Sequence, residues 1–454
     1  MFLKAARSVI ASCLMAVGVF GAVPAQAETL ADALASAYRN SNLIEQNRAV
    51  LRAADEDVAG AVAKLRPVLQ WVADWDWTDT PAGRSSTASL ALQAQMTLFD
   101  FGRNQLGIQI AEQAVLATRQ ALVSVEQDVL LSAVSAYFGL RSALENVAIN
   151  ENSVRVLNET LRATRDQFEV GEVTRTDVAL AEARLAAARA ALAAARGQLA
   201  VARESYKAAT GHYPGPLAGA PKPPALPATL AEAQRIAQRS HPAILQAQYQ
   251  AKGADLGVSL AAAQRRPNLT GTAGVSLTEG GTEAAALGLS LSQTIYSGGA
   301  LASAQRKAVA NREAARAALL QTSVNVSQNV AATWADIEVA RAQIKATEQQ
   351  VQAAQIAYDG VREEAKLGAR TTLDVLDAEQ SLLDARANRI QAQANLQVAY
   401  YSLLASMGLL TAENLGLNVP IYDAEAYYNA VRSAPATSIQ GDSLDRVLKA
   451  IGKN

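Results

Sequence analysis

The sequence contains few side chains of the kind that catalyse reactions or hold metal ions. It has two histidines, His212 and His241, and neither lies at metal-ligand spacing from the other or from a cysteine. The motifs of a serine nucleophile (G-x-S-x-G), a zinc protease (H-E-x-x-H) and a nucleotide-binding P-loop are absent from it. We therefore expect no enzyme activity, no metal and no cofactor. Both histidines are expected to be structural, and any energy must come from a partner.

The charged and hydroxyl-bearing residues that stand out follow two glycines. They are Arg370, Thr371, Asp374 and Asp377 after Gly368, and Thr176 and Asp177 after Gly171. On a helix, Asp374 and Asp377 place both carboxylates on one face, because positions i and i+3 are neighbours. Asp374 also has a simpler explanation, since aspartate is favoured as a helix cap, and Asp177 fits capping too. Asp377 is therefore the more informative residue.

Both glycine turns belong to a unit that occurs twice. Thr29-Leu30-Ala31 returns 200 residues later as Thr229-Leu230-Ala231, and Gly171 and Asp177 return 197 residues later as Gly368 and Asp374. A duplication this long indicates a body with two-fold pseudo-symmetry rather than a solenoid of short repeats. The repeats are expected at residues 28–213 and 228–410, with a proline-rich linker at 214–227 and a C-terminal tail at 411–454.

The N-terminus has the pattern of a secretory signal peptide. Lys4 and Arg7 precede an apolar run that ends in Pro24-Ala25-Gln26-Ala27, so cleavage is expected after Ala27 and residues 1–27 are lost. An N-terminal membrane anchor is the weaker alternative, because the apolar run is short. Cleavage removes the one cysteine, Cys13, which excludes disulfides, and lowers the net charge from −1 to −3 by removing two basic residues. That charge argues against nucleic acid as a partner.

Long helices are expected where prolines are absent. The windows 82–213 and 268–419 contain no proline and are rich in strong helix formers. We expect long helices at about 103–169 and 300–366, followed by return helices at about 176–209 and 373–406. Leu185, Leu192 and Leu199 recur with the seven-residue period of a coiled coil, which favours helix packing over a solvated alanine-rich helix.

Ahead of each long helix the pattern changes to strict alternation. Apolar and polar residues alternate over about 67–99 and again over about 267–296, which predicts two β-hairpins with one apolar face each. Trp71, Trp75 and Trp77 share the apolar face, and tryptophan favours the lipid interface. A soluble sheet packed on a helix is the alternative.

Four strands cannot close into a barrel, and lipid does not tolerate open sheet edges. A membrane-spanning barrel would therefore need several chains. Two chains give eight strands filled by side chains, whereas three give twelve strands with room for a lumen.

With these features, the sequence resembles the TolC family of outer-membrane channels over about residues 28–410. The duplication, Tyr296-Ser297-Gly298-Gly299 at a strand exit and the turn from Gly368 to Asp377 carry the resemblance. It implies a homotrimer with a twelve-stranded barrel in the outer membrane of a Gram-negative bacterium. It also implies an α-helical barrel across the periplasm, which docks on a periplasmic adaptor protein and an inner-membrane transporter. The expected function is the exit duct of a tripartite efflux or type I secretion system.

The resemblance also implies a gate at the periplasmic tips. There, Arg370 would bond Thr176 and Asp177 of a neighbouring helix, Asp374 and Asp377 would form rings of anions, and Gly171, Gly368 and Thr371 would contact the adaptor. Trp71, Trp75 and Trp77 would face lipid. One departure is that Ala365 stands where some members have a gate tyrosine, so the arginine–aspartate contacts carry more weight here.

Two rival functions are a secreted alanine-rich coiled-coil scaffolding protein without a pore and a conventional one-chain porin. In the tail, short helices are expected between Ile421 and Val431 and at Leu444–Ile451. The sequence does not identify the exported substrate, the adaptor or the transporter.

Overall fold

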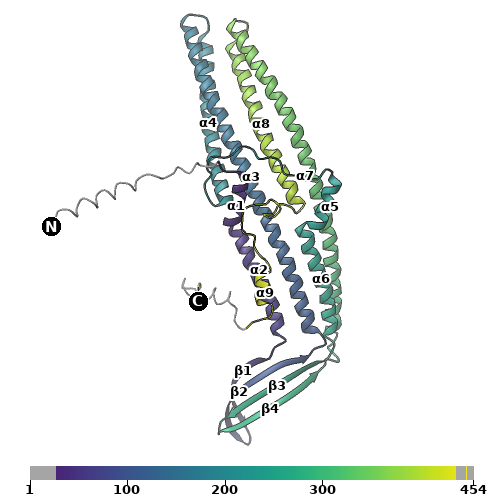
Figure 1. Ribbon diagram of the computed structural model, residues 1–454. Coiled ribbons are helices and arrows are strands. Elements are labelled where there is room, and N and C mark those ends of the chain that lie inside the picture. The colour runs from purple at the N-terminus through teal and green to yellow at the C-terminus, as the bar shows by residue number, and fades with distance from the viewer. Residues whose placement is uncertain (1–26, 436–445, 447–454) are drawn as a thin grey trace, which may run out of the picture.

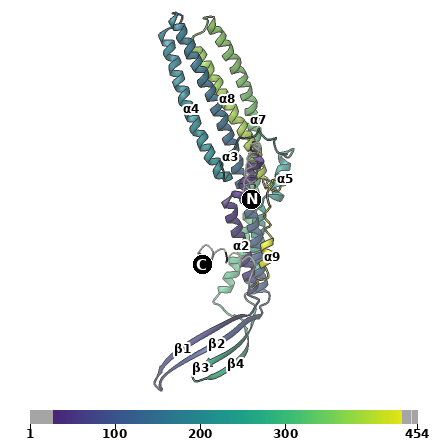
Figure 2. The ribbon, with the colours of Figure 1, turned by 60° about the vertical axis from the view of Figure 1, so that its left-hand side comes forward.

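The computed structural model describes residues 27–435 and residue 446 (Figure 1). The signal peptide, apart from Ala27, and the helix expected at Leu444–Ile451, apart from Arg446, lie outside the described residues. The described chain is elongated. Paired helices form one end of it and a four-stranded sheet forms the other (Figures 1 and 2).

The duplication is visible in the order of the elements. The first repeat contains α1 (Leu30–Asn40), α2 (Asn42–Ala63), β1 (Val68–Thr80), β2 (Gly83–Phe99), α3 (Arg103–Glu169) and α4 (Arg175–Thr210). The second contains α5 (Leu230–Ser240), α6 (Pro242–Ala263), β3 (Asn268–Thr278), β4 (Thr282–Ser292), α7 (Ala300–Lys366) and α8 (Thr372–Ser406). A short helix, α9 (Ala426–Val431), lies in the tail. Both long helices have 67 residues, which corresponds to about 100 Å.

The second hairpin ends earlier than the expected 296. Strand β4 stops at Ser292, and Ile295 and Tyr296 lie in an irregular segment before α7. Two glycines with positive φ, Gly298 and Gly299, follow them and form the turn into α7. In the first repeat the equivalent turn follows β2 more closely. There Asp100 accepts hydrogen bonds from the backbone N–H groups of Gly102 (2.9 Å) and Asn104 (2.7 Å).

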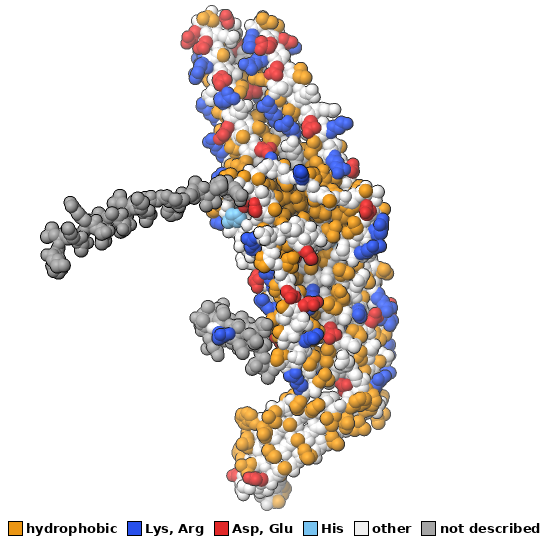
Figure 3. Space-filling view, viewed as in Figure 1, with side chains coloured by type: hydrophobic (Ala, Val, Ile, Leu, Met, Phe, Trp, Pro, Cys, Tyr) orange, Lys and Arg blue, Asp and Glu red, His pale blue; other side chains and the backbone are white. Residues whose placement is uncertain are grey.

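The sheet is antiparallel in the order β1-β2-β3-β4, so the two hairpins join through β2 and β3. Trp71 pairs with Leu92, and Leu92 pairs with Val275, which places their side chains on one face. The opposite face carries Asp74, paired with Ser89, and other polar residues. Figure 3 shows hydrophobic side chains covering much of the sheet surface turned to the viewer. Strands β1 and β4 are edges, each with one side unpaired within the described chain.

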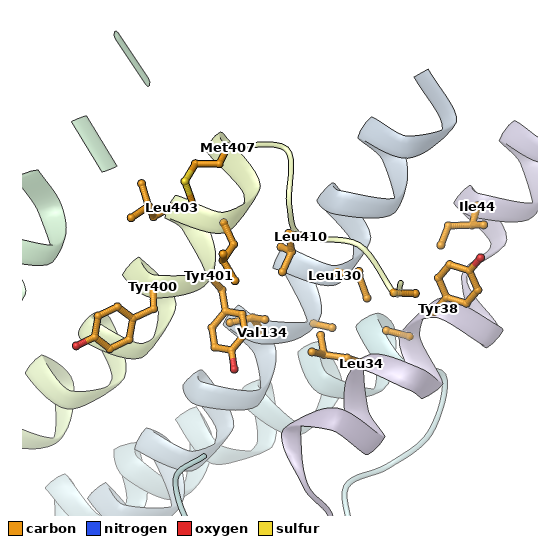
Figure 4. Close-up of a cluster of buried hydrophobic side chains, with 14 of the residues drawn as sticks. Leu34, Tyr38, Ile44, Leu130, Val134, Tyr400, Tyr401, Leu403, Met407 and Leu410 are labelled. Atoms are coloured by element: carbon orange, nitrogen blue, oxygen red, sulfur yellow. The ribbon is translucent and has the colours of Figure 1, made fainter. Parts of the chain in front are cut away.

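The main core lies midway along the molecule, where α1, α3, α8 and the start of the tail meet (Figure 4). Leu34, Leu130, Val134 and Leu410 are nearly or fully buried there. Helix α3 contains an 18-residue window with a mean hydropathy of 1.2, which by length and composition is enough to cross a membrane. In the structure α3 instead packs along α2, α4, α6 and α8, so this helix supplies core.

A matched pair of glycines lets each return helix end against the start of its own repeat. Gly211 and Gly408 have φ angles of +87° and +79°. A Cβ atom on Gly211 would lie 2.8 Å from Cβ of Asn40, and one on Gly408 would lie 2.8 Å from Cα of His241. Both the left-handed backbone and the close approach therefore require glycine.

Candidate functional site

The two glycine turns lie side by side at the end of the molecule opposite the sheet (Figures 1 and 2). Gly171 (φ +81°) ends the α3 hairpin and Gly368 (φ +78°) ends the α7 hairpin. In each turn the next backbone N–H reaches back to a carbonyl of the preceding helix, from Glu172 to Gln167 and from Ala369 to Glu364, at 2.9 Å. This is the usual glycine-dependent end of a helix, and it sets the position of the polar residues that follow.

Two of the expected gate carboxylates stabilise helix starts. Thr174 and Thr371 are the N-caps of α4 and α8, and both helices begin one residue earlier than expected. Asp177 and Asp374 each accept a hydrogen bond from the N–H of the capping threonine, at 2.9 Å, in reciprocal capping boxes. The threonine hydroxyl donates to the same carboxylate, and these two hydrogen bonds together hold the pKa of each carboxyl below the ordinary value. Asp374 is thus the partner of the cap, and Thr371 is the cap itself.

Arg370 has a partner within its own turn. Its Nε donates to Oε2 of Glu364 at 2.8 Å. Within this one chain Arg370 does not contact Thr176 or Asp177, and Asp177 is occupied by Thr174. The expected contact therefore requires a neighbouring subunit or a different rotamer of the arginine.

Asp377 joins the two hairpins of the chain. It forms an ion pair with Arg184 of α4. One residue earlier, Leu376 of α8 is only 2 % exposed, because it inserts between the helices of the first hairpin. Its neighbours in that cluster are Leu157, Leu161, Ala181 and Leu185. Sequence reasoning missed Arg184, whose equivalent in the second repeat is Ser381. The duplication therefore gave no signal for it.

Glu379 and Glu182 are equivalent in the two repeats, but their environments differ. Glu182 is exposed and pairs with Arg165 at 2.5 Å. Glu379 is half-buried between the hairpins, and its buried Oε2 has no hydrogen-bond partner among the described residues. Burial raises the pKa of Glu379 to about 7, although a hydrogen bond from Ser153 of α3 opposes the shift.

The contact between the hairpins should therefore depend on pH. The pKa of Glu379 is raised from 4.5 to about 7 when the hairpins are packed together. Protonated Glu379 therefore stabilises this contact fully below pH 4.5, and the stabilisation is lost as pH rises through about 7. We expect the contact to weaken by about 1 kcal/mol across this range, after allowance for solvent screening. Hydrogen exchange of the first turns of α8 measures this, and Glu379→Gln should remove the pH dependence. A wild-type protein with no pH dependence would contradict the assignment.

The apolar face of the sheet is highly exposed. Trp71, Trp75 and Trp77 are 72 %, 69 % and 57 % exposed, and on β4 Leu287 and Leu289 are 89 % and 75 % exposed. Continuous apolar surface of this kind marks an interaction site on a soluble protein. Here the strands alternate apolar and polar residues, and neither face of the sheet is covered by a helix. An apolar surface in this setting is typical of a β-barrel that has lipid on one side and water on the other.

The chain contains two copies of a long helical hairpin and an amphipathic four-stranded sheet. This combination defines the class of protein: a subunit of an outer-membrane channel. The outer membrane efflux protein family model matches residues 33–212 and 234–409. The chain belongs to this family.

Named relatives agree with this assignment. The chain is 35 % identical to the outer membrane efflux protein BepC of Brucella suis over 438 residues, which cover 94 % of this chain and 96 % of BepC. It is 26 % identical to the outer membrane protein TolC of Escherichia coli, covering 86 % and 84 % of the two chains.

Solved structures show the same fold. The CusC structure matches with a TM-score of 0.76 at 21 % identity, over 83 % of this chain and 91 % of that one. The open state of the Neisseria gonorrhoeae channel MtrE matches with a TM-score of 0.74 at 23 % identity, over 85 % and 90 %. The resemblance to TolC and the mainly helical fold with four strands are thus confirmed. The protein is an efflux channel of the outer membrane, and nothing among these relatives supports the scaffolding alternative.

Proposed function

We propose that three copies of the chain form a twelve-stranded barrel in the outer membrane and a helical tunnel through the periplasm. The tunnel receives substrates at its tips from an inner-membrane transporter and a periplasmic adaptor protein. The complex is a tripartite efflux or type I secretion system. The transporter supplies the energy, and the tips around Gly171, Gly368 and Thr371 contact the adaptor.

The unpaired edges of the sheet carry this proposal. Four strands leave β1 and β4 open, and open edges are not tolerated in lipid, so β4 of one chain must pair with β1 of the next. Twelve strands leave space for a lumen, whereas eight would be filled by side chains. The polar face, with Asp74 and Gln93, then lines the water-filled interior.

Edge pairing is testable by disulfide trapping, because the one native cysteine, Cys13, lies in the predicted signal peptide. Gln70→Cys in β1 would be combined in turn with Ala284→Cys, Ala286→Cys and Ser290→Cys in β4, which sample different registers of the polar face. At least one pair should give disulfide-linked trimers in outer-membrane fractions. Pairing of Gln70→Cys with Gln198→Cys, in α4, is the control. If every cysteine pair gave only monomers or disulfide-linked dimers, the proposed trimer would be contradicted.

A second part of the proposal concerns closure of the tips. Arg370 of one subunit would leave Glu364 and bond Asp177 or Thr176 of the adjacent subunit, which holds the tunnel shut. Arg370→Ser should then raise the closed-state conductance of trimers in planar bilayers, because one contact that holds the tips together is lost at each of the three subunit boundaries. Arg162→Ser, on the exposed shaft of α3, is the control. An unchanged conductance would remove Arg370 from the gate.

Asp374 and Asp377 would form anionic rings at the same level in a trimer, and such rings favour cations. The capping role of Asp374 leaves its charge intact, whereas Arg184 partly neutralises Asp377. Replacing both aspartates with asparagine should reduce cation selectivity and block by multivalent cations. If neither changed, the rings would have no such role.

A further inference from the structure

The chain crosses between helix and sheet four times, and basic residues lie at three of these crossings. Lys64 and Arg66 lie between α2 and β1, and Arg265 and Arg266 lie between α6 and β3. Arg103 begins α3, four residues after the end of β2. We call these five residues the basic collar. Figure 3 shows Lys and Arg side chains at the ends of the helices next to the hydrophobic surface of the sheet.

The collar has almost no acidic counterpart. Within the crossings 64–67, 100–103, 264–267 and 293–299 the only acidic residue is Asp100, and its carboxylate accepts hydrogen bonds from two backbone N–H groups. The fourth crossing is uncharged, but Arg306 and Lys307 follow it in α7. Among the described residues none of these seven cations forms an ion pair. The whole chain, in contrast, has a net charge of −1.

Three collar residues have their charged ends available. Lys64, Arg265 and Arg266 are exposed, and no hydrogen bond from their charged groups is found within the described residues. Arg66 and Arg103 instead brace the crossings. Arg66 donates to the carbonyls of Ser433 and Ala434, and Arg103 donates to the carbonyl of Pro267 at 3.1 Å. Carbonyls are neutral, so the positive charge of these two residues remains.

Large apolar side chains lie beside the collar. Phe99 and Leu65 are 55 % and 42 % exposed, and Ile295 and Tyr296 are 97 % and 87 % exposed. Aromatic side chains next to basic ones are typical of the level of the lipid headgroups. Because the helices lie in the periplasm, this level is that of the periplasmic leaflet.

We propose that the basic collar binds the phosphate groups of anionic phospholipids in the periplasmic leaflet of the outer membrane. The inference rests on the sheet being the part of the chain that contacts lipid. Acyl chains pack on the apolar face from Trp71 to Leu289, while headgroup phosphates contact Lys64, Arg265 and Arg266. The collar sets the depth of the barrel, because burying these cations in hydrocarbon is costly.

Charge complementarity favours lipid over a protein partner here. The cations form a band between an apolar surface and the helical shaft, and each lies within one turn of the apolar sheet. A phospholipid fits both parts of this surface, because its phosphate contacts the cations while its acyl chains pack on the apolar face. Basic pockets at the ends of membrane-spanning segments bind anionic headgroups in the same way.

The test compares lipid selectivity with the charges removed. Full-length protein is reconstituted in phosphatidylcholine, and electron paramagnetic resonance of spin-labelled phosphatidylglycerol and phosphatidylcholine gives their relative association constant. The variant is Lys64→Gln, Arg265→Gln and Arg266→Gln combined, which leaves the two bracing arginines in place. The control combines Arg162→Gln, Arg203→Gln and Lys345→Gln, which remove three exposed charges from the helical shaft.

Wild-type protein and the control should prefer phosphatidylglycerol, and the collar variant should lose this preference. Each basic residue near a membrane surface contributes about fivefold, so the loss is expected to be at least tenfold. No preference in the wild type, or an equal loss in the control, would overturn the proposal. Displacement of phosphatidylglycerol by inorganic phosphate, but not by chloride of equal ionic strength, would assign the collar to free phosphate instead. Bilayer conductance of the same samples separates this outcome from a failure of the channel itself.

Discussion

Leu289→Arg is expected to prevent stable insertion of the protein in the outer membrane. Leu289 lies on the apolar face of β4, three residues before the strand ends at Ser292, is 75 % exposed and is paired with Gly271. An arginine on the lipid face of a barrel costs up to about 2–4 kcal/mol, with the largest cost at the centre of the membrane, and a trimer would carry three of them. The measurement is the fraction of the protein that is recovered from outer membranes as a heat-stable oligomer.

Ser290→Arg is the matched control, because the next residue of the same strand faces the opposite side of the sheet. In a water-filled lumen this arginine keeps its hydration, so assembly should be close to that of the wild type. Normal insertion of Leu289→Arg would show that the apolar face does not contact lipid. Equal failure of both variants would show that β4 tolerates no arginine at all.

The strands were predictable from the sequence because each has one polar and one apolar face. Where neither face is covered by helices, the two-residue period stays clear, as it does from Leu69 to Trp77. The end of β4 was not predictable. Ile295 and Tyr296 extend the series of apolar residues beyond the strand. Pairing with β3 nevertheless ends at Asn268, which is opposite Ser292.

At the tips, the sequence predicted the glycine turns and a capping role for Asp374, although the cap itself is Thr371 and Asp374 is its reciprocal partner. Both features are local, because they depend on residues three to six positions apart. The salt bridge from Arg184 to Asp377 joins residues that are 193 positions apart. It depends on how two hairpins pack, which no spacing encodes.

Burial of single polar groups was also beyond the sequence. Glu182 and Glu379 occupy equivalent positions in helices of similar composition. Glu182 is exposed and paired, whereas Glu379 is half-buried with one carboxylate oxygen fully buried. The difference arises because α8 packs against α3 of the other repeat at this level. Pseudo-symmetry in the sequence therefore predicts equivalent backbones, and it does not predict equivalent environments.

Leu130→Ala should destabilise the junction of helices midway along the molecule. Leu130 is fully buried, and Figure 4 shows it between α1 and the segment that carries Leu410. Replacing a buried leucine with alanine costs about 2–5 kcal/mol, through lost burial and the cavity that remains. That is a large part of a typical folding free energy of about 5–15 kcal/mol. The free energy of unfolding in urea, followed by circular dichroism, measures the effect.

Leu130→Met keeps the volume and the apolar character of the side chain, so it should cost less than about 1.5 kcal/mol. The difference between the two variants isolates the cavity from any general intolerance of the site. It also bears on the channel, because this core fixes the first repeat, through α1 and α3, to the second repeat, through α8. If Leu130→Ala unfolds at the same urea concentration as the wild type, other contacts must hold the two repeats together.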